Sequence, residues 1–143
     1  MGPFPYGKLA HVQSSTRYGG MENSSAIFYA EKPYVERRMT EGIVRHETAH
    51  QWFGDAVTER EWAHLWLSEG FASYFDLVIG AALDGDSVLT GGMRRNAESY
   101  FRSKVVDRPV VDTAEHDPNR LLNATTAVAR RNGTESAKAE SSG

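Results

Sequence analysis

Cysteine is absent from the 143 residues of this chain, so no disulfide can stabilise its fold. The absence also leaves the redox compartment unreadable, because no thiol is there to report it. An excess of positive charge is lacking too, since the formal net charge at pH 7 is −3. Phosphate binding needs clustered lysine and arginine. We therefore expect no nucleic-acid partner.

Long hydrophobic runs are missing as well. The longest apolar stretch covers residues 71–83 and is interrupted by Ser73, Asp76 and Gly80. It is too short and too polar to span a bilayer, which takes about 20 apolar residues. The first residues lack the charged start and the apolar run of a secretory signal. We expect no membrane segment in this chain. Localisation stays open, with the cytoplasm slightly favoured.

The remaining sequence predicts strands at the start of the chain and helices after them. Residues 9–16 and 26–30 have strand-like composition, and Gly19 and Gly20 predict a turn between them. Residues 33–53 have the periodicity of one long helix. The stripe that should be buried on this helix consists of Met39, Ile43, His46, His50 and Phe53.

Two more helices are predicted downstream. One runs from about residue 61 or 65 to residue 83, and its apolar stripe consists of Leu67, Phe71, Tyr74, Val78 and Ala81. The other runs to about residue 103, with Asp86 well placed to cap its N-terminus. From Thr125 onward the chain is small and polar and cannot bury much apolar surface, so we expect disorder over residues 125–143.

The most informative motif is His-Glu-Thr-Ala-His at residues 46–50. Histidines four residues apart lie on one face of a helix, one turn from each other. Eighteen residues separate His50 from Glu69. A catalytic zinc takes three protein ligands and keeps one position open, and His46, His50 and Glu69 supply three. Glu47 lies beside them and stays free to act as general base on a zinc-bound water.

Each residue of the motif also has a simpler explanation. The two histidines could be hydrogen-bonded core residues, and Glu47 and Glu69 could be solvated helix glutamates. Their joint spacing outweighs these alternatives, so we expect one Zn²⁺ per chain, held by His46, His50 and Glu69. The other histidines have no ligand spacing, and the tryptophans are most simply explained as packing residues: His11, His64, His116, Trp52, Trp62 and Trp66.

The sequence on both sides of the motif carries a family resemblance. Residues 19–23 read Gly-Gly-Met-Glu-Asn, and residues 66–72 read Trp-Leu-Ser-Glu-Gly-Phe-Ala. With the motif, these segments resemble the aminopeptidase N (membrane alanyl aminopeptidase) family of zinc metallopeptidases, in the gluzincin clan. Ser68 replaces the asparagine that is usual in the family. The resemblance runs from about Phe4 to Asn123, most of the chain.

The resemblance implies an α+β fold that is mainly helical here. It would be part of a thermolysin-like catalytic domain, in which a short β-hairpin precedes the zinc-site helices. Residues 1–124 would form this partial domain and residues 125–143 a separate tail. Family members carry a β-rich domain before this region and a helical domain after it. We therefore expect a piece of a longer enzyme or a truncated product, with the missing domains as its partners.

The resemblance also implies a reaction, the zinc-dependent hydrolysis of the N-terminal residue from a peptide. Glu47 would be the catalytic base, and Glu22 would bind the free α-amine of the substrate. Gly19 and Gly20 would let the backbone approach the substrate, and Met21 and Asn23 belong to the same substrate-binding segment.

Two alternatives to an active aminopeptidase stay open. In the family, a tyrosine well downstream of the third ligand stabilises the oxyanion, and this chain has no tyrosine after Tyr100. The chain could therefore be a non-catalytic zinc-binding fragment that lacks this tyrosine and the flanking domains. More distantly, a leukotriene-type epoxide hydrolase shares the metal site and often has Gly-Gly-Met-Glu-Asn. The side-chain preference of the enzyme is not predicted.

Overall fold

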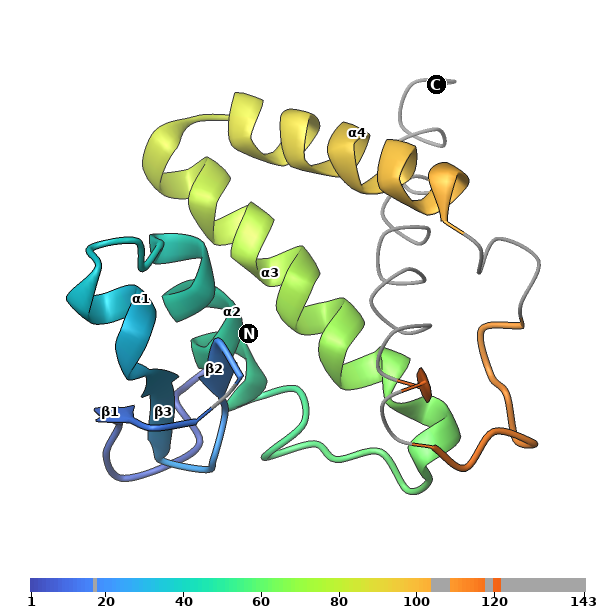
Figure 1. The fold of residues 1–143 in the computed structure, drawn as a ribbon, viewed down its shortest axis with the longest axis horizontal. Coiled ribbons are helices and arrows are strands. Elements are labelled where there is room, and N and C mark those ends of the chain that lie inside the picture. Colours follow the sequence, from blue (N-terminus) through green and yellow to red (C-terminus); the bar gives the residue numbers. More distant parts are fainter. Residues whose placement is uncertain (17, 104–108, 118–119, 122–143) are drawn as a thin grey trace.

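A computed structural model describes residues 1–16, 18–103, 109–117 and 120–121 of the chain. A small sheet and two short helices lie at one end, and two longer helices extend from them (Figure 1). The predicted α+β class, mainly helical, is confirmed. The tail predicted for residues 125–143 lies outside the described residues. Among the described helices, none is long and apolar enough to cross a membrane.

The sheet has three strands in the order β1-β3-β2. The strands are β1 (Ala10–Ser14), β2 (Gly20–Met21) and β3 (Ala26–Ala30). β2 and β3 are antiparallel and form a hairpin, but it is not the one expected between residues 9–16 and 26–30, because β1 runs parallel to β3. The core under this sheet includes Ile27 and Tyr29, both buried.

The turn predicted at Gly19 and Gly20 is wrong. Gly20 lies in β2 and pairs with Tyr29. The tight turn follows β2 instead, where the Ala26 N–H donates to the Asn23 carbonyl at 2.9 Å. Ser25 has a left-handed backbone there, with φ 64°. β1 and β2 lie on opposite edges of β3. Gly20 is thus a strand residue, and glycine in a strand often marks a close approach to a neighbouring element.

The single helix predicted for residues 33–53 is also wrong, because two helices replace it. They are α1 (Glu31–Val35) and α2 (Glu41–His50). Between them Arg37 has a left-handed backbone with φ 54°, and the N–H groups of Arg38 and Met39 both donate to the Pro33 carbonyl. The Thr40 side chain then accepts from the Ile43 N–H and caps α2. The turn at Arg37 and the Thr40 cap thus end one helix and begin another, although the apolar periodicity of the sequence continues across the break.

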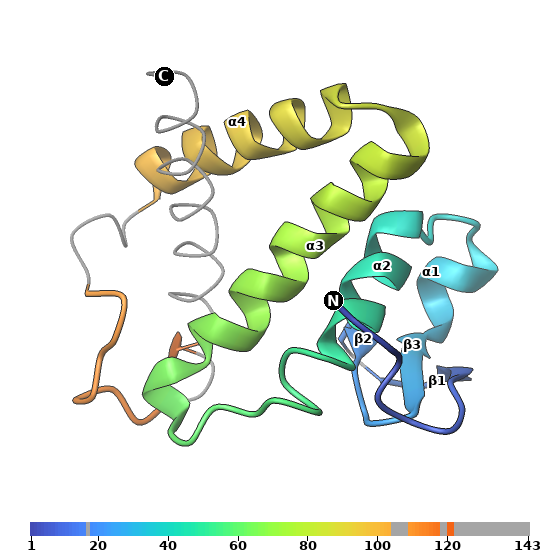
Figure 2. The ribbon, with the colours of Figure 1, turned by 180° about the vertical axis from the view of Figure 1, so that it is seen from behind.

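The longer helices are α3 (Trp66–Asp84), which follows a 3₁₀ turn at Trp62–His64, and α4 (Ser87–Arg102). α3 packs against both α2 and α4, and the reverse view in Figure 2 shows the same arrangement. Asp86 precedes α4 but makes no capping hydrogen bond, contrary to expectation. Its backbone is already helical (φ −57°, ψ −23°), whereas a capping residue is typically extended.

The face of α3 that packs against α2 differs from the apolar stripe in the sequence. Phe71 and Tyr74, two members of that stripe, are 42 % and 41 % exposed. The buried residues of α3 are small: Ser68, Ala72 and Gly80. Small side chains let two helices approach closely, so packing selects this face although it carries Glu69 and Asp76. The rings of Phe71 and Phe75 still stack on Phe53, with centroids 4.9 and 5.1 Å away.

A half-buried ion pair fixes α2 against α3. Arg45 Nε donates to Asp76 Oδ1 at 2.8 Å, and the Arg45 side chain is only 18 % exposed. Arg45 also forms an ion pair with Glu41 on its own helix, with 3.4 Å between the guanidinium nitrogen and the carboxylate oxygen. The Glu41 side chain, however, is 84 % exposed. The contact between the helices should therefore be the stronger one, because solvent weakens exposed ion pairs.

We predict that Asp76→Ala lowers the free energy of unfolding by about 1–3 kcal/mol, because it leaves a half-buried guanidinium without its close acceptor. Glu41→Ala is the matched control on the same arginine and should stay within about 0.5 kcal/mol of the unsubstituted chain. Urea unfolding followed by circular dichroism measures both values. Equal losses in the two variants would contradict the role given to the Arg45–Asp76 pair.

Candidate metal and substrate site

The residues of the predicted metal site come from two helices that pack together. His46 and His50 lie one turn apart on α2, and Glu69 lies in the first turn of α3. The two histidine Nε2 atoms are 3.1 Å apart. Glu69 Oε2 lies 3.4 Å from His46 Nε2 and 3.8 Å from His50 Nε2. Within the described ranges, these three residues form the one group of His, Asp or Glu close enough to hold a metal ion.

The orientation of His50 is set by its other ring nitrogen. His50 Nδ1 lies 3.0 Å from the Phe53 carbonyl, and the residue is almost fully buried. A carbonyl oxygen only accepts, so Nδ1 carries the proton and donates it. Nε2 then presents a lone pair toward His46 and Glu69. Metal-binding histidines are commonly held in this way by a backbone carbonyl.

The three facing atoms fit the dimensions of a zinc site. A circle drawn through them has a radius of about 2.0 Å, and zinc bonds to imidazole nitrogen or carboxylate oxygen measure about 2.0–2.2 Å. His46, His50 and Glu69 would thus be spaced to hold one zinc ion together. Two imidazoles and one carboxylate are also a common donor set for catalytic zinc.

The protonation states of His50 and Glu69 suit a metal as well, whereas His46 would have to release its proton to bind one. Burial lowers the pKa of His50, and the positive charge of His46 lowers it further. Burial alone would raise the pKa of Glu69, but the hydrogen bond with His46 and the positive charges of His50 and His46 together outweigh burial and lower it. Burial opposes protonation of His46, yet the hydrogen bond and charge of Glu69, with the charges of Glu47 and Asp76, raise its pKa overall. His50 is therefore neutral and Glu69 ionised at pH 7, as metal ligands must be.

Glu47 lies next to this group but is not part of it. Its carboxylate is buried, and burial raises its pKa to about 7. The positive charge of His46 opposes this rise, whereas the carboxylates of Glu22 and Glu69 add to it. These electrostatic couplings show that the predicted catalytic, substrate-binding and metal residues share one environment.

A cavity of about 320 Å³ brings most of the predicted site residues together. Its lining consists of Tyr18, Gly20, Met21, Glu22, His46, Glu47, His50, Trp62, Leu65 and Glu69. Gly19 and Asn23, the outer members of the predicted substrate-binding segment, are exposed and do not line it. The structure thus joins the middle of that segment to the metal-site residues.

Three lining residues were missed by the sequence analysis. Trp62, expected to be a packing residue, is 66 % exposed and lines this cavity, so that expectation is wrong. The helical spacing does place Trp62 on the face of Glu69, seven residues before it, and Leu65, four residues before Glu69, could have been placed there in the same way. Tyr18 directly precedes the two glycines. This position beside the Gly-Gly-Met-Glu-Asn segment indicated that Tyr18 could lie near the site. Its spacing did not indicate whether the side chain lines the cavity.

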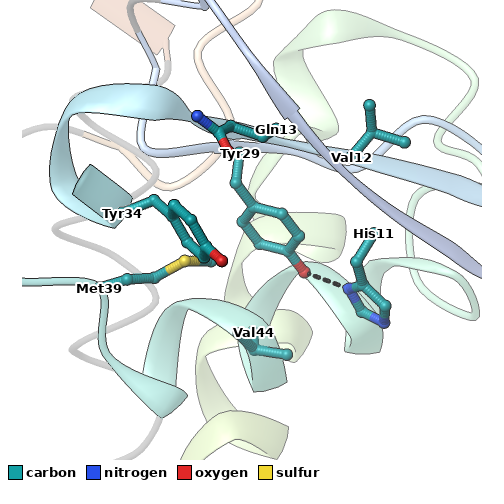
Figure 3. Close-up of a pocket in the computed structure, with 7 residues that line it drawn as sticks. All are labelled: His11, Val12, Gln13, Tyr29, Tyr34, Met39 and Val44. Atoms are coloured by element: carbon teal, nitrogen blue, oxygen red, sulfur yellow. Dashed lines mark hydrogen bonds between the residues drawn. The ribbon is translucent and has the colours of Figure 1, made fainter. Parts of the chain in front are cut away.

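The other histidines lie outside the metal group, as expected. His11 lines a separate cavity of about 390 Å³ and contacts the Tyr29 hydroxyl through Nδ1 at 2.9 Å (Figure 3). Burial, with a smaller contribution from Glu47, raises the pKa of Tyr29 to about 12, so this hydroxyl stays protonated. His116 lines a third cavity, which shares Trp62 with the metal-site cavity.

Gly20 explains how β2 can lie so close to α2. A Cβ atom built on Gly20 would overlap with the Glu47 carboxylate, whereas one on Gly19 would meet nothing within 4 Å. Neither glycine is among those with a positive φ. The requirement at residue 20 is therefore space for the Glu47 side chain, rather than backbone freedom.

We predict that Gly20→Ala lowers the free energy of unfolding of the zinc-free chain by about 1–3 kcal/mol, because the added methyl group must displace Glu47. Gly19→Ala makes the same chemical change one residue earlier and should stay within about 0.5 kcal/mol. Urea unfolding of the two variants side by side tests this. A Gly20→Ala variant no less stable than Gly19→Ala would show that Glu47 does not need the space.

Together, the fold and the cluster define a metallopeptidase-like domain, with two helices presenting a metal triad beside a buried glutamate. The chain belongs to peptidase family M1: the sequence model of the Peptidase family M1 domain matches residues 1–125. The resemblance to the aminopeptidase N family is thereby confirmed.

Several relatives are named leucine aminopeptidase 2. The protein from Coccidioides immitis is 38 % identical over 135 residues, which cover 85 % of this chain and 21 % of the relative. The protein from Ajellomyces capsulatus is 33 % identical over 114 residues, covering 75 % of this chain and 18 % of the relative. The chain thus spans about a fifth of the length of these relatives.

Solved structures of an M1 zinc metallopeptidase from Deinococcus radiodurans share the fold. One matches with a TM-score of 0.66 and 30 % identity, covering 89 % of this chain and 27 % of the neighbour. A variant of that enzyme bound to a Tyr-Ser-Ala substrate has the same TM-score, with 29 % identity and coverage of 87 % and 26 %. The expected thermolysin-like, gluzincin-type catalytic fold is consistent with these neighbours.

Proposed function

We propose that this chain carries the zinc site and the amine-binding site of an aminopeptidase that removes the N-terminal residue from peptides. The observation that carries the proposal is the triangle of His46, His50 and Glu69 in one cavity with Glu47 and Glu22. The names of the relatives and the peptide complex of the neighbour support it.

The proposed roles follow from where each side chain lies. His46, His50 and Glu69 would hold the zinc, and Glu47 lies within the same cavity without belonging to their triangle. Zinc held there supplies a Lewis acid that polarises the scissile carbonyl and makes water a better nucleophile at neutral pH. Glu47 takes the proton of the attacking water and returns it to the leaving amine.

Glu22 gives the proposed site its selectivity for chain ends. It lines the cavity, and its negative charge contributes an upward shift to the pKa of Glu47 and of His50. An exopeptidase must recognise one positive charge at a set distance from the scissile carbonyl. A carboxylate in the same cavity as the metal ligands provides such a partner, because a protonated α-amine pairs with it. Peptides with a free N-terminus are therefore the proposed substrates.

The second candidate is a zinc-binding chain without catalysis. The family resemblance motivates it, because the family has an oxyanion tyrosine well downstream of the third ligand and residues 101–143 contain no tyrosine. Loss of one oxyanion donor typically costs about a hundred- to a thousand-fold in turnover. In the described part of the chain, Tyr18 is the single tyrosine that lines the metal-site cavity. The epoxide hydrolase alternative rests on the shared motif, and no structural observation favours it.

An assay of the zinc-loaded chain separates these candidates. Alanine and leucine p-nitroanilides are offered to this chain and to the full-length Coccidioides immitis relative under identical conditions. Turnover within about tenfold of the relative supports an aminopeptidase complete in this chain. Absence of turnover, with zinc bound, selects the non-catalytic alternative.

We predict that the folded chain binds about one zinc ion and that His46→Ala abolishes this binding, because two donor atoms do not hold a catalytic-type site. His116→Ala is the matched control, since His116 is exposed and lies outside the triangle. Metal analysis after dialysis gives the zinc content of each protein. Equal zinc retention in the original chain and His46→Ala would sink the ligand assignment.

The role of Glu47 is tested in a full-length relative, at the glutamate that aligns with it. We predict that the change corresponding to Glu47→Gln keeps the zinc but lowers turnover by about 10²–10⁴-fold, because an amide cannot accept the proton. Zinc content and p-nitroanilide hydrolysis are measured on the same preparation. Turnover near that of the parent enzyme would show that this glutamate is not the base.

A further inference from the structure

Gln51 is a buried amide that directly follows the second histidine of the metal triangle. The residue has no exposed surface, although it is polar and lies at the C-terminal end of α2. A buried amide is stable only when its donors and acceptor are matched. The partners of Gln51 therefore indicate what the side chain does.

Those partners tie α2 to the turn that carries Glu22. Gln51 Oε1 accepts from the Ser25 N–H at 2.7 Å, and Gln51 Nε2 donates to the Glu22 carbonyl at 2.8 Å. The second N–H of Nε2 faces Asp55 Oδ2, also at 2.8 Å. Because the Glu22 carbonyl only accepts and the Ser25 N–H only donates, the orientation of the amide is unambiguous. One side chain thus holds both ends of the segment from Glu22 to Ser25.

The segment has few other bonds to the rest of the chain, and they hold its C-terminal end: the Ala10 N–H donates to the Ser25 carbonyl at 2.9 Å, and the Ser24 side chain bonds to Asp55. β2 pairs with β3 through only Gly20 and Met21. Beyond them the turn is closed by one backbone hydrogen bond, from the Ala26 N–H to the Asn23 carbonyl, and Ser25 has a left-handed backbone. A non-glycine residue stays in that conformation when its surroundings enforce it. Gln51 supplies two of the bonds that do so.

We propose that Gln51 is a positioning residue, which fixes Glu22 relative to the metal triangle and thereby sets the selectivity for a free α-amine. The proposal rests on the function proposed above. Gln51 directly follows His50 and caps α2, so the metal ligand and the residue that holds the Glu22 turn are adjacent in the chain. Displacement of the turn would move the Glu22 carboxylate without moving the metal ligands.

Glutamate and leucine at residue 51 would each remove this support for a different reason. A glutamate fills nearly the same volume and can still accept from the Ser25 N–H. Its carboxylate, however, would face the Glu22 carbonyl and the Asp55 carboxylate, two acceptors with which it cannot bond. A leucine fills the space but makes none of the three hydrogen bonds.

Two zinc-directed probes separate amine selectivity from metal binding. Leucine hydroxamate carries the α-amine, and 4-methylpentanoyl hydroxamate is the same molecule without it. Isothermal titration of the zinc-loaded full chain measures both affinities. The ratio of the two reports the amine contribution, and the affinity for the amine-free probe reports the metal site alone. The variants are Gln51→Leu, Gln51→Glu and, as a control on an exposed glutamine of β1, Gln13→Leu.

We expect the original chain and Gln13→Leu to prefer the amine-bearing probe by about tenfold or more. In Gln51→Leu and Gln51→Glu the preference should fall to within about threefold, while zinc content and affinity for the amine-free probe stay within about threefold. If Gln51→Leu does not fold, Gln51→Glu carries the test, since its volume is conserved. Full amine preference in a folded Gln51 variant overturns the positioning role.

A chain that shows no amine preference before substitution contradicts the proposed amine site rather than the clamp. Amide hydrogen exchange then decides about the clamp, because the Ser25 N–H donates to Gln51. Exchange at Ser25 should be about tenfold faster in Gln51→Glu or Gln51→Leu than in Gln13→Leu. Unchanged exchange at Ser25 would overturn the proposal whatever the probes show.

Discussion

The packing of α3 on α2 is the contact on which the site depends. His46 and His50 lie on one helix, and Glu69 reaches them only because α3 lies close enough across the interface. Ala49 and Ala72 are completely buried, and small residues of this kind allow the close approach. The Arg45–Asp76 ion pair joins the two helices and helps to fix their relative position. A shift of α3 by one residue would turn Glu69 away from the histidines, because successive helical side chains point about 100° apart.

The sheet supplies the second half of the site. β2 brings Gly20 against Glu47, and the turn after β2 brings Glu22 into the cavity. Gln51 ties this turn to the helix that carries the metal ligands. The buried polar groups around the cavity thus form one connected set, in which burial and like charges raise the pKa of Glu47 while contact with His46 keeps Glu69 ionised. In this arrangement the metal, the proposed base and the proposed amine partner are positioned by the same short stretch of α2.

The metal triangle was predictable from sequence because two of its three residues are close together in the chain. A separation of four residues places His46 and His50 together in any α-helix. The spacing from His50 indicated Glu69, and the family resemblance supplied Glu22. The break between α1 and α2 was not predictable from periodicity, since the Thr40 cap and the turn at Arg37 compete with it locally. The parallel pairing of β1 with β3 depends on a crossover, which strand composition does not encode. The exposure of Phe71 and the position of Trp62 were set by tertiary packing, which favoured the small-residue face of α3.

The central claim is that the interface between α2 and α3 builds one zinc position. Diffraction from crystals of the zinc-loaded chain, recorded on both sides of the zinc absorption edge, tests this claim directly. The account predicts a single anomalous peak within about 2.0–2.2 Å of His46 Nε2, His50 Nε2 and Glu69 Oε2. A strongest peak at any other set of side chains, or a peak at the two histidines with Glu69 turned away, would contradict it.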